Sequence, residues 1–136
     1  MQIATTDDQK LISDWQKPTP GAAISVDSET VRNKPIFVFI LFKGCRPDQS
    51  GNCNVTADFE TFEPGGKSYD VRTNAPIWVG HPPPPGDNLQ LSESALGLRV
   101  EDKDSLGPYR VVATITDHVA GITLKTQQVL NATAAQ

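Results

Sequence analysis

Apolar and polar residues alternate along most of this chain with a period of two, the pattern of half-buried β-strands. The clearest example is residues 109–115, where every second side chain is apolar. The pattern predicts further short strands at residues 24–26, 36–42, 55–60, 68–71, 76–79, 89–91, 96–100 and 122–129. Turn residues separate these runs at intervals of about ten residues, a spacing that indicates an all-β sandwich or barrel.

The strand at residues 36–42 is apolar at every position, which predicts a central strand covered on both faces. A two-layer sandwich covers only one face of each strand, so a further element must cover the face of Phe37, Phe39 and Leu41. We expect an N-terminal helix to do so. The alternative is a partner subunit, because a large bare apolar patch is unusual on a monomer.

The first segment of the chain is the one place where the pattern predicts a helix. Thr6 and Gln9 have the spacing of a capping box, and Leu11 and Trp15 are four residues apart on one helical face. Pro18 then ends the helix. A helix of about ten residues is marginal alone, so we expect it to dock on the sheets.

The segment Asp104-Ser-Leu-Gly-Pro-Tyr109 resembles the start of the penultimate strand in immunoglobulin-like and fibronectin-like domains. In those domains a corner tyrosine bonds its hydroxyl to nearby backbone, so the resemblance gives Tyr109 a structural role. Residues 110–117 and the hairpin at Gly121 resemble the last two strands, and the likeness covers about the last 50 residues. It implies an immunoglobulin-like antiparallel β-sandwich of about seven to nine strands. The chain also resembles small exported bacterial proteins, a similarity that implies no activity.

The length of 136 residues fits one domain. We expect an N-terminal helical or extended segment at residues 1–20, the sandwich at 21–130 and a frayed tail at 131–136. The net charge is −4, and the basic residues are scattered singly, which argues against nucleic acid as a partner. No apolar run approaches the length of a membrane span.

Cys45 and Cys53 flank a loop rich in turn residues between two apolar runs, which predicts a β-hairpin closed by a disulfide. A zinc site with His81 and His118 is an alternative, although zinc usually takes cysteines two to four residues apart. Two free buried thiols are the other alternative. A disulfide implies an oxidising compartment, so we expect a periplasmic or secreted protein whose signal peptide is absent from this sequence.

Acidic residues offer two candidates for chemistry. Asp58 and Glu60 share one face of a strand, whereas a glycosidase needs two carboxylates that face each other across a sugar. Residues 101–104 include the acids Glu101, Asp102 and Asp104, and a loose calcium site is an alternative interpretation of this cluster. An EF-hand is excluded because Leu and Ala occupy two liganding positions. No motif indicates a cofactor or a catalytic triad, and we interpret His118 as an exposed turn residue.

Trp78 precedes a run of four prolines that must be extended. If its two neighbours face the core, Trp78 points outward and forms a contact patch with His81 and Pro83. Tyr69 is a second candidate for this patch. The alternative is that Trp78 packs beneath the proline run as a satellite of the core.

These observations favour a non-enzymatic extracytoplasmic module for protein binding or assembly, with no cofactor. The partner would be another protein or a second copy of the chain, bound through a sheet edge, the Cys45–Cys53 loop or the region around Trp78. A carbohydrate-binding module that uses Trp78 and Tyr69 is the alternative. A hydrolase that uses Asp58 and Glu60 is a third interpretation, since fold alone does not determine function.

Overall fold

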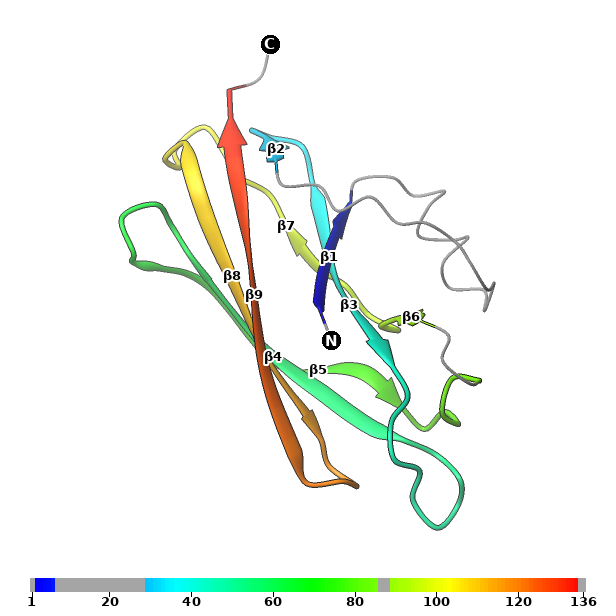
Figure 1. Cartoon of the computed structure of the whole chain (residues 1–136). Coiled ribbons are helices and arrows are strands. Elements are labelled where there is room, and N and C mark those ends of the chain that lie inside the picture. The colour runs from blue at the N-terminus through cyan, green and yellow to red at the C-terminus, as the bar shows by residue number, and fades with distance from the viewer. Residues whose placement is uncertain (1, 7–28, 86–88, 135–136) are drawn as a thin grey trace.

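The computed structural model describes residues 2–6, 29–85 and 89–134, and these residues form nine β-strands without a helix (Figure 1). The strands are β1 (Gln2–Thr6), β2 (Glu29–Val31), β3 (Ile36–Lys43), β4 (Asn54–Phe62), β5 (Ser68–Val79), β6 (Leu89–Leu91), β7 (Leu96–Leu98), β8 (Gly107–Asp117) and β9 (Ile122–Thr133). The predicted all-β character is therefore confirmed for the described residues.

The strands belong to two sheets. In the first sheet, β3 pairs with β1 on one side and with the short strands β6 and β7 on the other. The second sheet has the order β2-β9-β8-β4-β5. All pairs are antiparallel except β2 with β9, which run parallel. The chain thus changes sheet five times along the described strands, between β1 and β2, β2 and β3, β3 and β4, β5 and β6, and β7 and β8.

One apolar cluster joins the two sheets. It takes alternate residues from β4 and β8 in the second sheet and from β3 and β7 in the first. In β8 the side chains of Tyr109, Val111, Ala113 and Ile115 are all buried, which confirms the one-sided strand predicted there. Alternation with a period of two places these side chains on one face, and the burial of that face is the main stabilising contribution.

The second face of β3 is also covered. Phe39 and Leu41 are buried, yet neither belongs to the cluster between the sheets. The helix predicted to cover them lies outside the described residues. Residues 2–6, which precede it, form β1 beside β3. The sequence did not predict this strand because the segment is mostly polar.

Two boundaries differ from the predicted ones. The last strand continues to Thr133, past the start of the predicted tail at 131. It is held there by parallel pairing with β2 and by burial of Ala132. The runs predicted at residues 68–71 and 76–79 form one long strand, β5, whose pairing with β4 shifts register between them.

Candidate functional site

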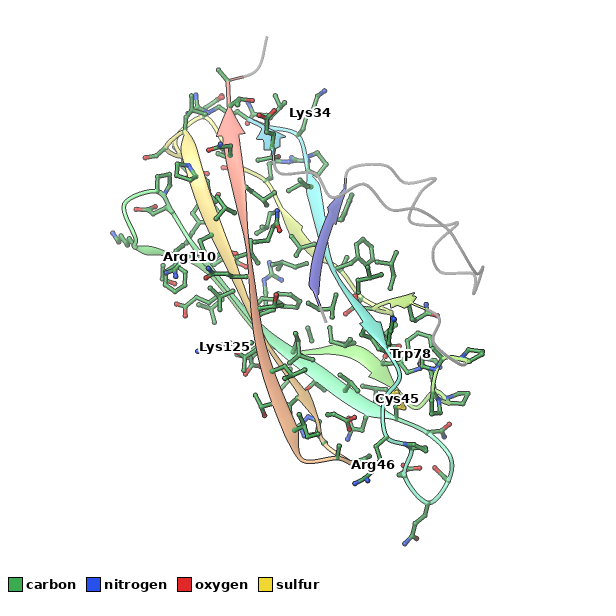
Figure 2. All side chains as sticks on the ribbon, viewed as in Figure 1. Lys34, Cys45, Arg46, Trp78, Arg110 and Lys125 are labelled. Carbon is green, nitrogen blue, oxygen red and sulfur yellow. A yellow bond between two sulfur atoms is a disulfide. The ribbon has the colours of Figure 1, made fainter. Side chains whose placement is uncertain are left out.

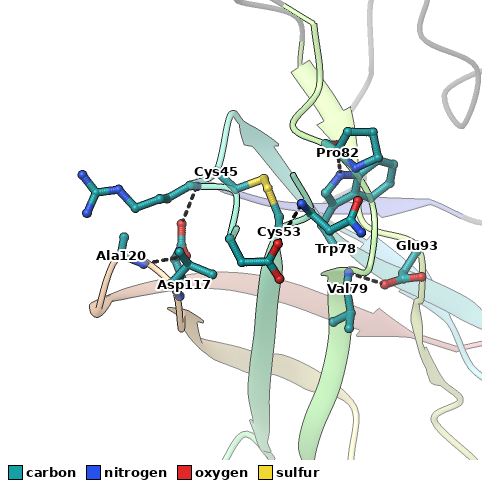
Figure 3. Close-up of a disulfide and its surroundings, with 12 residues drawn as sticks. Cys45, Cys53, Trp78, Val79, Pro82, Glu93, Asp117 and Ala120 are labelled. Carbon is teal, nitrogen blue, oxygen red and sulfur yellow. Dashed lines mark hydrogen bonds between the residues drawn. A yellow bond between two sulfur atoms is a disulfide. The ribbon is translucent and has the colours of Figure 1, made fainter. Parts of the chain in front are cut away.

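The predicted disulfide is present, and it joins Cys45 to Cys53 with their Cα atoms 6.0 Å apart (Figure 3). The hairpin predicted around it is wrong, because β3 and β4 belong to different sheets. The loop crosses between the sheets and contains its own tight turn, in which Gly51 N donates to Asp48 O. Because that local turn has the residues of a hairpin turn, sequence alone does not distinguish the two arrangements.

Asp117 ties this loop to the turn between β8 and β9. Its carboxylate accepts hydrogen bonds from the backbone N of Arg46 at 3.0 Å, Val119 at 3.2 Å and Ala120 at 3.1 Å (Figure 3). The side chain is 9% exposed. No sequence motif assigns a role to Asp117, the last residue of β8. An aspartate commonly accepts from backbone N–H groups two and three residues ahead in an Asx turn, so the bonds to Val119 and Ala120 could be predicted from sequence. The bond to Arg46 could not, because Arg46 is far away in the sequence.

Trp78 packs beneath the proline run, which is the alternative to the predicted outward contact patch. Its ring centroid lies 5.8 Å from that of Phe42 and 4.7 Å from that of His81. Its indole N–H donates to the Pro82 carbonyl at 2.8 Å (Figure 3). The side chain is half-buried against the core cluster. Val79 is exposed, so the condition under which Trp78 would point outward is not met.

The other members of the predicted patch are also engaged or distant. The imidazole of His81 lies 3.0 Å from the carboxylate of Glu93, and Pro83 is half-buried. Tyr69 lies near the opposite end of β5 from Trp78, nine positions away, which corresponds to about 30 Å in an extended strand. The two aromatic rings therefore do not form one platform for a sugar.

Tyr69 and Tyr109 form a polar and aromatic corner with the loop before β8. Their rings meet edge to face with centroids 5.2 Å apart. The Tyr109 hydroxyl donates to Ser105 O at 2.7 Å, the bond that the tyrosine-corner pattern predicts. The Tyr69 hydroxyl lies 2.7 Å from the carboxylate of Asp104 and 3.0 Å from Arg99 O. This corner connects β5 and β8 to the loop that precedes β8.

The corner shifts the acidity of its members. The Glu101 backbone N–H, followed by the Tyr69 hydroxyl, lowers the pKa of Asp104. Burial, followed by the hydrogen bond to Asp104, raises the pKa of Tyr69 well above its ordinary value. Burial also raises the pKa of Tyr109. The folded protein therefore keeps both phenols protonated at a pH where an unfolded chain begins to lose those protons.

We expect the Tyr69→Phe variant to lose less stability than the parent as the pH rises above about 10, the pKa of an unperturbed tyrosine. A group whose pKa is raised on folding contributes its stability below the unfolded pKa, and this contribution falls as the pH rises further. Urea unfolding at pH 8 to 11 measures the effect, with Tyr109→Phe for comparison, since the chain has two tyrosines. Equal alkaline loss in parent and Tyr69→Phe would contradict the assignment.

The predicted calcium candidates are occupied by protein groups. Asp104 accepts from Glu101 N at 2.9 Å and contacts Tyr69, while Asp102 accepts from Asn33 Nδ2 at 2.8 Å. Lys103 Nζ lies 3.8 Å from the Glu101 carboxylate. Across residues 2–6, 29–85 and 89–134, no three Cys, His, Asp or Glu side chains are grouped to hold a metal ion.

Asp58 and Glu60 line a hollow of about 300 Å³ on the outer side of the second sheet, the side that faces away from β3. Asp58 accepts from Asn74 N at 2.9 Å, and Glu60 accepts from Ser68 Oγ at 3.0 Å. Both acids project from β4 in the same direction rather than toward each other. His118 lies elsewhere, with Nε2 2.8 Å from Thr56 Oγ1.

Strand β9 forms an open edge of the second sheet. Among the described residues, β2 is the only strand that pairs with β9 on that side, along Asn131–Thr133, and β1 of the first sheet also lies close to β9. Ile122 and Leu124 pair with Asp117 and Ile115 and so share the core-facing side of the sheet. They are nevertheless 54% and 47% exposed. The apolar side of β9 therefore extends beyond the core.

No protein-family model and no curated protein matches this chain. Within the described part, no helix is long and apolar enough to cross a membrane. The molecule offers three candidate binding surfaces: the open β9 edge, the outer face of the second sheet and the region of the disulfide.

Proposed function

We propose that this chain is a non-enzymatic, extracytoplasmic binding or assembly module of immunoglobulin-like sandwich fold, and that its ligand is another protein. The disulfide supports the compartment, because such bonds persist in the periplasm or outside the cell. A binding role is favoured over a hydrolase because Asp58 and Glu60 are neighbours on one open strand face, with no opposed pair of carboxylates across the hollow.

The order of strand pairing supports the immunoglobulin-like assignment. Two mainly antiparallel sheets share one core, and successive strands cross between them as in Greek-key sandwiches. Near the start of the penultimate strand, β8, stands Tyr109, whose hydroxyl donates back to Ser105 O. A disulfide at the end of β3 replaces the bond between the two sheet centres of antibody domains.

The single observation that carries the binding proposal is the open β9 edge. From Ile122 to Leu130 its backbone groups have no partner strand on that side among the described residues. Such an edge is a template for addition of a strand, in which backbone hydrogen bonds give affinity and exposed side chains give specificity. Ile122 and Leu124 supply the apolar contacts, and Lys125 is the one charged residue in this stretch.

The occupant that fits this edge is an extended segment of a partner protein that is apolar toward Ile122 and Leu124. Lys125 projects from the other face of β9. It favours an acidic residue paired with it on the added strand, because like charges directly opposite destabilise a strand pair. A lone lysine also discourages indiscriminate pairing of edges, which is how native proteins protect such strands. The edge is therefore suited to one matched partner.

Site-specific photocrosslinking tests this proposal. We expect a benzoylphenylalanine at position 124 to form a discrete adduct when the full chain is expressed in its native envelope. The same probe in place of Leu106, which is also exposed but precedes β8, is the matched control. A second variant carries the probe at 122 together with Leu124→Lys, and the adduct should disappear. Equal adducts at 106 and 124, or an adduct that survives Leu124→Lys, would overturn the proposal.

A further inference from the structure

The outer face of the second sheet carries apolar residues in two adjacent rows. The strand register places Val129, Arg110 and Phe62 in one row across β9, β8 and β4, and Val112, Glu60 and Val71 in the next row across β8, β4 and β5. Val71 is 56% exposed and Val129 45% exposed. Side chains of this kind are usually scattered singly over a monomer, whereas here they lie in adjacent rows.

Charged residues lie within and beside these rows in a polarised arrangement. The acids Asp58 and Glu60 project from β4, whereas the bases Arg110 and Lys125 project from β8 and β9. Figure 2 shows Arg110 and Lys125 on the side of the sheet away from β3. The guanidinium of Arg110 lies over the Phe62 ring at 4.7 Å. One half of the face is thus acidic and the other half basic.

None of these four charges has an ionic partner within 4.0 Å among the described residues. The ion pairs found there are Arg72 with Asp70, His81 with Glu93, and Lys103 with Glu101. Asp58 and Glu60 accept only from a backbone amide and a serine hydroxyl. Both halves of the face therefore remain free to pair with opposite charges on another molecule.

We propose that this outer face binds a second copy of the chain, face to face, about a two-fold axis that runs along the strands. Such an axis exchanges the two halves, so that the acidic β4 of one copy meets the basic β8 and β9 of the other. A surface with opposite charges on its two sides is self-complementary under this symmetry, which an isologous dimer requires. The inference rests on the proposed assembly role and names one partner for it.

The size of the face sets the expected affinity. Four strands about 4.8 Å apart and about 30 Å long give roughly 600 Å² per copy, or about 1,200 Å² in total. That area lies at the lower end of specific interfaces. Because apolar and charged side chains are interspersed over this area, the face should give a dissociation constant on the order of 10–100 μM.

Charge reversal tests the inference with two complementary variants. In the first, Arg110→Glu and Lys125→Glu make the face wholly acidic, and in the second, Asp58→Lys and Glu60→Lys make it wholly basic. We expect the parent to dimerise and each variant alone to associate at least tenfold more weakly. An equimolar mixture of the two should form a heterodimer at least as tight as the parent dimer. Sedimentation velocity from about 1 μM to 1 mM, in about 50 mM salt, measures all three.

The control variant combines Lys34→Glu with Lys43→Glu, which changes the net charge as much as the acidic variant does, at exposed sites before β3 and at its end, in the first sheet. It should dimerise like the parent. A parent that stays monomeric at 1 mM, or a mixture that forms no heterodimer, would overturn the inference. The Leu124 crosslink is the independent readout for the β9 edge. If the basic variant, which leaves β9 unchanged, keeps that adduct and the parent does not dimerise, this inference fails while the proposed function stands.

Discussion

Replacing Trp78 with alanine is expected to lower the free energy of unfolding by about 3–4 kcal/mol, the usual cost of truncating a large packed aromatic side chain. The variant loses the ring contacts with Phe42 and His81 and leaves the Pro82 carbonyl without its indole donor. Trp78 connects the end of β5 to the loop at 80–85. We therefore expect that loop to loosen while the rest of the second sheet stays folded.

Urea unfolding of a matched second variant separates a packing role for Trp78 from a contact role. Urea unfolding followed by circular dichroism gives the free energy, and Trp78→Phe is the matched variant because it keeps an aromatic ring but loses the N–H donor. We expect Trp78→Phe to cost about 1–2 kcal/mol, close to one hydrogen bond with some lost contact. If Trp78→Ala costs less than about 1 kcal/mol, the residue is a surface contact and the outward patch is restored.

Features of this fold that depend on residues close together in the sequence could be predicted, and those that depend on distant residues could not. The alternation in β8 identifies its buried side because side-chain direction depends only on neighbouring residues. The corner at Tyr109 could be predicted for the same reason, since its hydroxyl bonds four residues back to Ser105. The pairing of Cys45 with Cys53 was predicted correctly because the chain offers only these two cysteines.

The errors arise where strands from distant parts of the chain meet. The turn residues around Asp48 fit two arrangements equally well: a hairpin in which β3 and β4 pair, and a loop that crosses between the sheets. The polar segment of β1 carries little periodicity, so only its pairing with β3 identifies it as a strand. Strict alternation leaves the direction of Trp78 open, because the strand bulges near its end and the proline loop covers the indole.

The candidate surfaces depend even more on register. Asp58 and Glu60 were recognised as neighbours from their spacing alone, whereas Arg110 and Lys125 reach the same face only because β4, β8 and β9 pair in one register. No local pattern connects residues that are 50 or more positions apart in the chain. The polarity of the outer face is therefore a property of the sheet, and a slip of one residue would send these charges to the opposite side.

Asp117 is the position where we expect the second large effect, because one carboxylate holds two loops. Asp117→Ala should lower the free energy of unfolding by about 3 kcal/mol, since it removes the acceptor for three backbone N–H groups. A hydrogen bond to a charged group contributes about 1.5–3 kcal/mol, and water restores part of this at the exposed turn. Urea unfolding at pH 7 measures the change.

Asp117→Asn separates the two halves of this interaction. The amide oxygen can still accept from Val119 and Ala120, whereas the new NH₂ group faces the Arg46 N–H, which is itself a donor. We therefore expect a cost of about 1–2 kcal/mol and faster reduction of the nearby disulfide by dithiothreitol. Asp48→Ala is the comparison, because the exposed carboxylate of Asp48 accepts from Ser50 and Asn52 within the same loop and does not reach the β8–β9 turn. If Asp48→Ala costs as much as Asp117→Ala, the stability of the loop comes from its own turn and the tie to the β8–β9 turn contributes little.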